Sequence, residues 1–160
     1  MKQAATPEFA DYIKQVKSNA KSLAAELMGR NYKLISDGTD NHIVLMSCVD
    51  KGLTGSKMEN ACDAVHITLN KNTIIGDKSA QTPGGIRIGT PAVTTRGYMD
   101  ADMKDVAYFL DETFKISLDI QAKKGKKLTE FKAGLADSKE IKDLNAEVHK
   151  FSCQFDIPGF

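Results

Sequence analysis

An apolar stripe near the start of the chain constrains the fold more than any other feature. Six apolar residues recur there at spacings of four and three positions, which is typical of an amphipathic α-helix. The six are Phe9, Ile13, Val16, Ala20, Leu23 and Leu27. Thr6 suits the N-cap, Pro7 the first helical position and Gly29 the end. We predict a helix from Pro7 to about Met28, longer than the average of about 11 to 12 residues, and expect it to connect two domains.

The segment that follows has the composition of a small sheet with a covering helix. Residues 32–36 and 42–49 are rich in Ile, Val, Leu and Tyr, and the turn-forming residues 37–41 lie between them. This arrangement predicts an antiparallel hairpin. Residues 54–62 are expected to form a short helix, and residues 66–69 a third strand. Alternating strands and helices favour a small sheet covered by helices.

The last third of the chain is predicted to be helical. One apolar stripe runs through residues 103–114 and another through residues 141–155. Residues 137–140, Asp-Ser-Lys-Glu, offer a capping box for the final helix. The basic run Lys123–Lys127 lies between the stripes. It could bind phosphate, but a solvated connector is the commoner role of such a run.

Composition narrows the class of protein. The chain has 160 residues, which indicates one domain. Its net charge of +1 gives no overall positive electrostatic potential that would attract nucleic acid. Its apolar runs are far shorter than the roughly 20 residues that span a bilayer, so we expect no membrane segment. Three cysteines without a CxxC pair argue against a zinc site and fit a reducing compartment. The sequence has the character of a cytosolic protein.

The polar segment 70–97 is the predicted location of the chemistry. It is rich in Asn, Lys, Gly, Asp, Thr and Pro, and only residues 85–88 resemble a strand. Long ordered loops are commonly functional. Arg87 lies among glycines, and its guanidinium matches a carboxylate in a bidentate manner. An internal ion pair with an aspartate is the alternative, and Arg96 carries the same ambiguity.

Other common sites find little support in the sequence. There is no GxSxG elbow and no HExxH motif. His42, His66 and His149 are dispersed, and a structural or surface role is the commoner one for each. We therefore predict neither a hydrolytic triad nor a metal centre. Asn72, Lys78 and Ser79 are further polar candidates for a small-molecule site.

Residues 70–97, NKNTIIGDKSAQTPGGIRIGTPAVTTRG, closely resemble the C-terminal domain of serine hydroxymethyltransferase. The resemblance extends to KQAATPEFADYIKQV, to YKLISDGTDNHIVLMSCVDKGLTG and to the terminal FSCQFDIPGF, so it covers nearly the whole chain. It implies an α/β fold of the two-layer α+β kind, the C-terminal domain of the aspartate-aminotransferase-like transferases. That domain has a small antiparallel sheet with helices packed mainly on one face. Residues 1–30 would be the interdomain helix and residues 31–160 the small domain.

The resemblance also implies a function for the parent enzyme and roles for particular residues. The family uses pyridoxal 5'-phosphate to interconvert serine and glycine, and it transfers a one-carbon unit to tetrahydrofolate. Arg87 matches the family's arginine for the amino-acid carboxylate. Asn72, Ser79, Ala80 and Gln81 match its folate-contacting positions. The catalytic and cofactor-binding residues would lie in the other domain.

The departures from the family pattern concern completeness. The large domain with the Schiff-base lysine is absent, and Lys71 and Lys78 lie outside its motif. Gly84 stands where many relatives carry serine, so one side-chain hydrogen bond is missing. The segment after Met1 resembles the middle of an interdomain helix. We therefore expect a fragment, inactive alone, of a homodimeric or homotetrameric parent.

Two other hypotheses stay open at this point. The chain could be a stand-alone binding module for an anionic metabolite, since it is long enough to fold alone. It could also serve assembly, if the first helix exposes its apolar stripe. We expect a cytoplasmic protein, and an organellar parent stays open because a targeting peptide would precede this segment.

Overall fold

Six α-helices and three antiparallel strands make up residues 2–158, the part of the chain that the computed structural model describes. The helices are α1 (Pro7–Gly29), α2 (Gly55–Ala64), α3 (Pro91–Thr95), α4 (Met103–Lys124), α5 (Leu128–Asp137) and α6 (Lys139–Ser152). The strands are β1 (Ile43–Ser47), β2 (Asn70–Asn72) and β3 (Gly85–Gly89). Short 3-10 turns lie at Gln3–Ala5, Ile35–Asp37, Val49–Lys51 and Asp100–Asp102.

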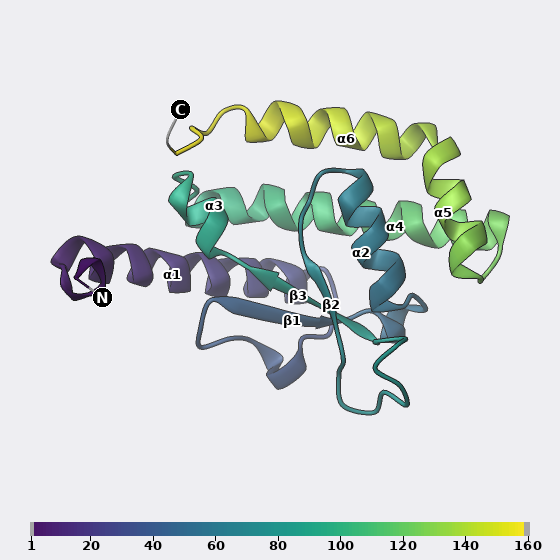
Figure 1. The fold of residues 1–160 in the computed structure, drawn as a ribbon, viewed down its shortest axis with the longest axis horizontal. Coiled ribbons are helices and arrows are strands. Elements are labelled where there is room, and N and C mark those ends of the chain that lie inside the picture. Colours follow the sequence, from purple (N-terminus) through teal and green to yellow (C-terminus); the bar gives the residue numbers. More distant parts are fainter. Residues whose placement is uncertain (1, 159–160) are drawn as a thin grey trace.

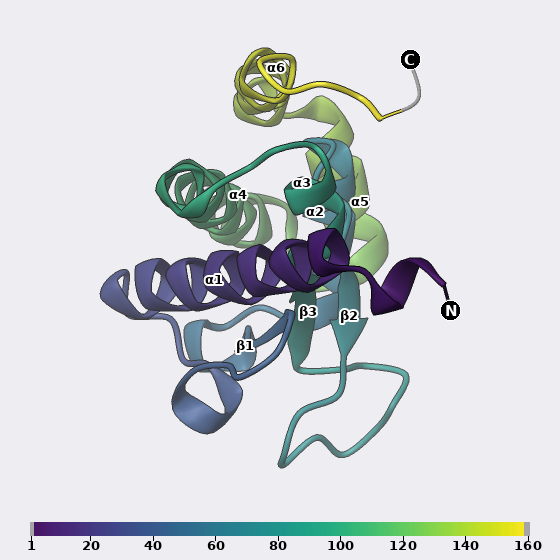
Figure 2. The same cartoon turned by 90° about the vertical axis from the view of Figure 1, so that its left-hand side faces the viewer.

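The sheet has the order β1-β3-β2, so β3 is its central strand. Because side chains alternate along a strand, Ile86 and Ile88 of β3 point to one face, where they are buried in the hydrophobic core. The long helices lie on that side of the sheet, as Figures 1 and 2 show. The predicted fold class, a small antiparallel sheet with helices mainly on one face, is confirmed.

Helix α1 forms as its apolar stripe predicts. Thr6 Oγ1 accepts a hydrogen bond from the N–H of Phe9 (3.3 Å), and Pro7 is the first helical residue. The buried part of the stripe runs from Val16 to Leu27 and includes Leu23. Leu23 and Leu27 share a core with β1, β3 and α4. Figure 2 shows α1, α4 and α6 stacked as successive layers.

The end of α1 is joined to α4 by a polar cluster around Asp111. Its carboxylate accepts hydrogen bonds from the hydroxyl of Tyr32 (2.8 Å) and, at 3.5 Å, from Arg30 Nη1, and it forms an ion pair with Lys115 (2.9 Å). Burial acts to raise the pKa of Asp111, but these hydrogen bonds and charges hold it below its usual value. The carboxylate is therefore charged and fully paired inside the fold.

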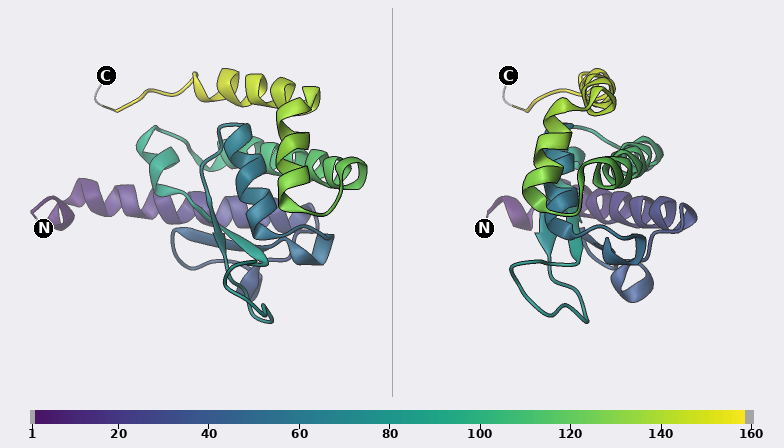
Figure 3. Two further views of the ribbon diagram at one scale, coloured as in Figure 1. Left: turned by 45° about the vertical axis from the view of Figure 1, so that its right-hand side comes forward. Right: turned by 90° about the vertical axis from the view of Figure 1, so that its right-hand side faces the viewer.

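A second hydrophobic cluster joins α2, α4, α5 and α6. Its largest fully buried side chain is Phe131 of α5. Figure 3 shows α5 crossing beside α2 and leading into α6. Ser138 caps α6, since its hydroxyl accepts from the N–H of Ile141 (3.2 Å). The predicted capping box is only half formed, because Glu140 accepts a hydrogen bond from the Ser138 hydroxyl (2.8 Å). The basic run Lys123–Lys127 ends α4, turns at Gly125 and leads into α5. Helix α5 itself was not predicted from the sequence.

Two strand predictions were wrong. Residues 32–36 contribute only a single bridge, between Leu34 and Met46, because a 3-10 turn with a left-handed Ser36 follows at once. Residues 66–69 form no strand, and the strand begins at Asn70 instead. His66 has a φ of +62°, and the N–H of Ile67 still bonds back to α2 at 2.8 Å. The chain is therefore still turning away from α2 where the strand was predicted.

Candidate functional site

Arg87 lies on the face of the sheet that the helices do not cover. It is exposed between the buried Ile86 and Ile88 of β3, as strand alternation requires. Its neighbours in register are Leu45 of β1 and Asn70 of β2. Within residues 2–158, no carboxylate forms an ion pair with its guanidinium and no hydrogen bond engages it. The internal ion pair considered from the sequence is therefore not formed.

A hollow of about 450 Å³ lies beside Arg87 on this face. Its polar lining comes from His42, Thr68, Asn70 and Arg87, and its apolar lining includes Pro91. A permanently charged fork at the edge of such a hollow can bind a small carboxylate through two parallel hydrogen bonds. The other lining residues are Ile43, Leu69, Gly89 and Ala92.

The predicted folate-contacting residues lie at and beyond the end of β2. Asn72 pairs with Gly85, two positions from Arg87 along β3. Its amide donates to Thr73 O (2.6 Å). Ser79, Ala80 and Gln81 are exposed on loop 73–84, which Figure 1 shows extending beyond the sheet on the side away from the helices. The structure thus brings Asn72 near Arg87 and places the other three on an adjoining loop.

Sequence reasoning did not single out Asn70, which lies directly opposite Arg87. Opposite residues of antiparallel strands have Cβ atoms about 4.5 to 5.5 Å apart, so both side chains lie at the same edge of the hollow. The signal that could have found it is the spacing of Asn70 and Asn72. With one residue between them, the two must share a face of any strand.

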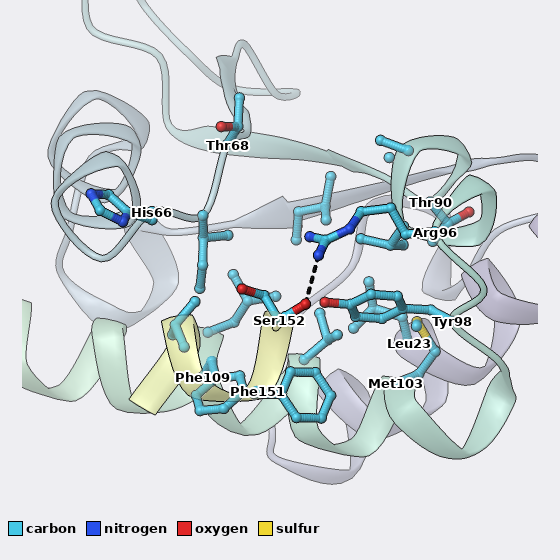
Figure 4. A pocket seen from close by; sticks show the side chains of 18 residues that line it. Leu23, His66, Thr68, Thr90, Arg96, Tyr98, Met103, Phe109, Phe151 and Ser152 are labelled. Atoms are coloured by element: carbon cyan, nitrogen blue, oxygen red, sulfur yellow. Dashed lines mark hydrogen bonds between the residues drawn. The ribbon is translucent and has the colours of Figure 1, made fainter. Parts of the chain in front are cut away.

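Arg96, the second candidate cation, has a structural role. Its Nη2 donates to Ser152 O (2.6 Å) and Phe155 O (3.1 Å), and its Nε donates to Asp156 O (3.2 Å). Figure 4 shows the guanidinium and the contact with Ser152 beside an apolar cavity of about 280 Å³. Phe155 also stacks on Tyr98, with ring centroids 3.7 Å apart. Arg96 therefore holds the chain that leaves α6.

The best-placed lysines do not fit a pyridoxal phosphate site. The ammonium group of Lys71 forms an ion pair with Glu59 (2.7 Å), and the main-chain N–H of Lys71 donates to the same carboxylate (3.0 Å). Lys57 is buried, and burial lowers its pKa, as a Schiff-base lysine would require. However, its ammonium donates to Gln121 and lies over the ring of Phe131, within the helix layer. Neither lysine lines the hollow beside Arg87.

The histidines and cysteines form no metal centre within the described residues, where no group of three potential ligands comes together. His149 and Cys153 are exposed neighbours at the end of α6, with Nδ1 and Sγ 3.6 Å apart. Cys48 and Cys62 are buried thiols, and burial raises the pKa of Cys48 to about 12. None of the helices between residues 2 and 158 is long and apolar enough to cross a membrane.

Comparisons with known proteins show which family contains this arrangement of residues. The sequence profile of the family described as serine hydroxymethyltransferase matches residues 1–110, which include Arg87 and loop 73–84. The chain belongs to the serine hydroxymethyltransferase family. It is 47% identical over 160 residues to serine hydroxymethyltransferase 4 of Arabidopsis thaliana, covering 100% of this chain and 34% of that protein.

Fungal members of the family are similarly close. The chain is 46% identical to a cytosolic serine hydroxymethyltransferase of Neurospora crassa over 163 residues, and 42% identical to a mitochondrial one of Candida glabrata over 166 residues. Each match covers 99% of this chain and 34% of the relative. The chain thus spans about a third of the length of the curated relatives it matches.

Proposed function

We propose that this chain is the part of a serine hydroxymethyltransferase that binds the carboxylate of the amino-acid substrate and contacts the folate cosubstrate. The observation that carries the proposal is the exposed Arg87, which has no acidic partner within residues 2–158 and borders a hollow. A solvated guanidinium at such an edge can bind a carboxylate without first breaking an internal ion pair. Membership of the family supports the same assignment.

In this proposal the two parts of the surface have different tasks. Arg87 fixes serine or glycine by its carboxylate and so limits the orientations in which the substrate can react. Asn72 and Ser79–Gln81 offer amide and hydroxyl groups to the ring system of tetrahydrofolate. These residues bind and orient, and the bond-breaking step needs groups that residues 2–158 do not supply. In the assembled enzyme, pyridoxal phosphate would stabilise the charge developed on the substrate's α-carbon.

We expect the cofactor to be held by the part of the enzyme that this chain does not match, about two-thirds of the length of each relative. The ion pair of Lys71 and the packing of Lys57 support this division, because both ammonium groups are already engaged. We further propose that the assembled enzyme is a homodimer or homotetramer. Several fungal relatives are named cytosolic enzymes, and on that basis we propose the cytoplasm for this protein, with an organellar form left open by the mitochondrial relative.

A chimaeric enzyme tests the proposal. This chain would replace the matching third of Arabidopsis serine hydroxymethyltransferase 4, and formation of glycine from serine would be measured with tetrahydrofolate. We expect turnover from the chimaera and none from the 160-residue chain alone. Arg87→Lys should raise the KM for serine and lower kcat, since lysine keeps the charge and loses the fork. Unchanged serine kinetics in this variant would remove Arg87 from the proposed site.

The binding-module alternative is decided on the isolated chain. Its own hydrophobic core, with fully buried residues such as Leu27, Met46 and Phe114, favours independent folding. Calorimetry with glycine, tetrahydrofolate and inorganic phosphate would then measure binding to this surface alone. The proposal expects weak or absent binding, because the site is completed by the rest of the enzyme. Tight binding of one of these ligands by the chain alone would favour the module.

A further inference from the structure

Loop 73–84 is tied at both ends to one side chain. Asp77 Oδ2 accepts hydrogen bonds from the main-chain N–H of Ile74 (2.9 Å) and from that of Gly84 (2.8 Å). The N–H of Asp77 in turn donates to Ile74 O (3.1 Å). Hydrogen bonds to a carboxylate are roughly twice as strong as those between neutral groups. A single residue therefore holds the beginning of the loop against its end.

The two glycines at the end of the loop make this closure possible. A Cβ atom on Gly84 would lie 2.5 Å from Asp77 Oδ1, so a side chain there would push the carboxylate away. A Cβ atom on Gly85 would lie 2.5 Å from Ile74 Cγ2, which shows how closely Ile74 packs on this backbone. Gly84 O also accepts from the N–H of Cys48 (2.8 Å), which anchors the closed end to the chain that follows β1.

The middle of the loop has no comparable anchor. Within the described part of the chain, the hydrogen bonds of residues 78–82 are made only among themselves, as from Gln81 N to Ser79 Oγ (3.1 Å) and from Thr82 N to Ser79 O (3.3 Å). Ile75 is 92% exposed. The direction in which residues 79–81 leave the sheet therefore depends on the closure at Asp77.

We propose that Asp77 is a positioning residue that pre-forms this loop for the ring system of tetrahydrofolate. The inference rests on the proposed function, since it takes Asn72 and Ser79–Gln81 as the folate-contacting residues. With the carboxylate in place, the ligand meets a loop that is already ordered, and the cost of ordering it is not subtracted from binding. Arg87 lies on β3, and within residues 2–158 no hydrogen bond or ion pair joins it to Asp77, whose carboxylate accepts from Ile74 and Gly84. Binding of the amino acid should therefore not depend on the closure.

Hydrogen exchange on this chain tests the closure itself. Asp77→Ala removes the acceptor, whereas Asp77→Asn keeps a side-chain oxygen that can accept both N–H groups. We expect the amides of Ile74 and Gly84 to exchange at least about tenfold faster in Asp77→Ala and to stay close to wild type in Asp77→Asn. Asp40→Ala, in another exposed turn, is the matched control. Unchanged exchange in Asp77→Ala overturns the inference.

The chimaeric enzyme tests the consequence for folate. Asp77→Ala should raise the KM for tetrahydrofolate about tenfold or more and leave the KM for serine unchanged, and Asp77→Asn should restore most of the folate affinity. Arg87→Lys should show the opposite split. Faster amide exchange without a change in the folate KM overturns the positioning role of Asp77. A chimaera without turnover, or Arg87→Lys with unchanged serine kinetics, instead counts against the proposed function.

Discussion

Arg87 and Arg96 are both arginines of the polar segment 70–97, and the structure predicts that replacing Arg96 by alanine destabilises the chain whereas replacing Arg87 does not. Arg96 donates to three main-chain oxygens of the segment that leaves α6, at 2.6, 3.1 and 3.2 Å. Arg87 has no such partner within residues 2–158 and is exposed. Both variants lose one positive charge. Any difference between them therefore reports the contacts and not the net charge.

The magnitude follows from the contacts. A hydrogen bond from a charged group contributes about 1.5 to 3 kcal/mol, and water replaces part of that contribution at the partly exposed carbonyls. We expect Arg96→Ala to lower the free energy of unfolding by about 2 to 3 kcal/mol. For a chain of this size, that corresponds to a fall in Tm of about 4 to 12 °C. Arg87→Ala should change the free energy of unfolding by less than about 0.5 kcal/mol.

Urea unfolding followed by circular dichroism at two temperatures measures both variants against the wild-type chain. The m-value should stay constant, so that a shift of the midpoint reports stability. If Arg87→Ala destabilised the chain as much as Arg96→Ala, the guanidinium of Arg87 would have an internal partner, and its assignment to a ligand would be refuted. Equal stability of Arg96→Ala and wild type would refute the structural role of Arg96.

Three further predictions concern the core. Gly55→Ala should destabilise the chain by about 1 to 3 kcal/mol, because the new Cβ would overlap Gly85 O; a neutral result in urea unfolding would contradict this packing. The Asp111 pKa is depressed on folding, so the stability lost in Asp111→Asn should be fully present above about pH 4 and should vanish as pH falls through the folded pKa. If the stability difference between the wild-type chain and Asp111→Asn grew as the pH fell, the prediction would be contradicted. With Cys48 and Cys62 buried, Ellman's reagent at pH 8 should titrate one thiol rapidly, and rapid reaction of all three would contradict their burial.

The sequence predicts best those features that depend on local spacing. The stripe from Val16 to Leu27 fixes α1, and Thr6 and Ser138 cap helices because their hydroxyls are the acceptors that a first turn needs. Residues 85–88 resemble a strand in the sequence, and β3 forms there. The family resemblance suggested roles for residues that composition alone left open, and those roles stay predictions.

Features that depend on distant partners were not predictable in this way. Residues 32–36 have the composition of a strand, but Ser36 and Asp37 adopt left-handed conformations that end the pairing after one bridge. The role of Arg96 depends on carbonyls more than fifty positions later in the chain. The closure at Asp77 depends on the main-chain amides of Ile74 and Gly84 both lying within hydrogen-bond distance of one carboxylate, three and seven positions from Asp77. None of these features leaves a periodic signal in the sequence.

The most direct test of the central claim is whether Arg87 recognises a carboxylate. In the chimaeric enzyme, glycine and glycinamide would be compared as competitive inhibitors of serine turnover, since glycinamide has an amide in place of the carboxylate. We predict that the wild-type chimaera favours glycine by about tenfold or more, and that Arg87→Ala removes this preference while it leaves the KM for tetrahydrofolate unchanged. A preference for glycine that survived Arg87→Ala would contradict the claim.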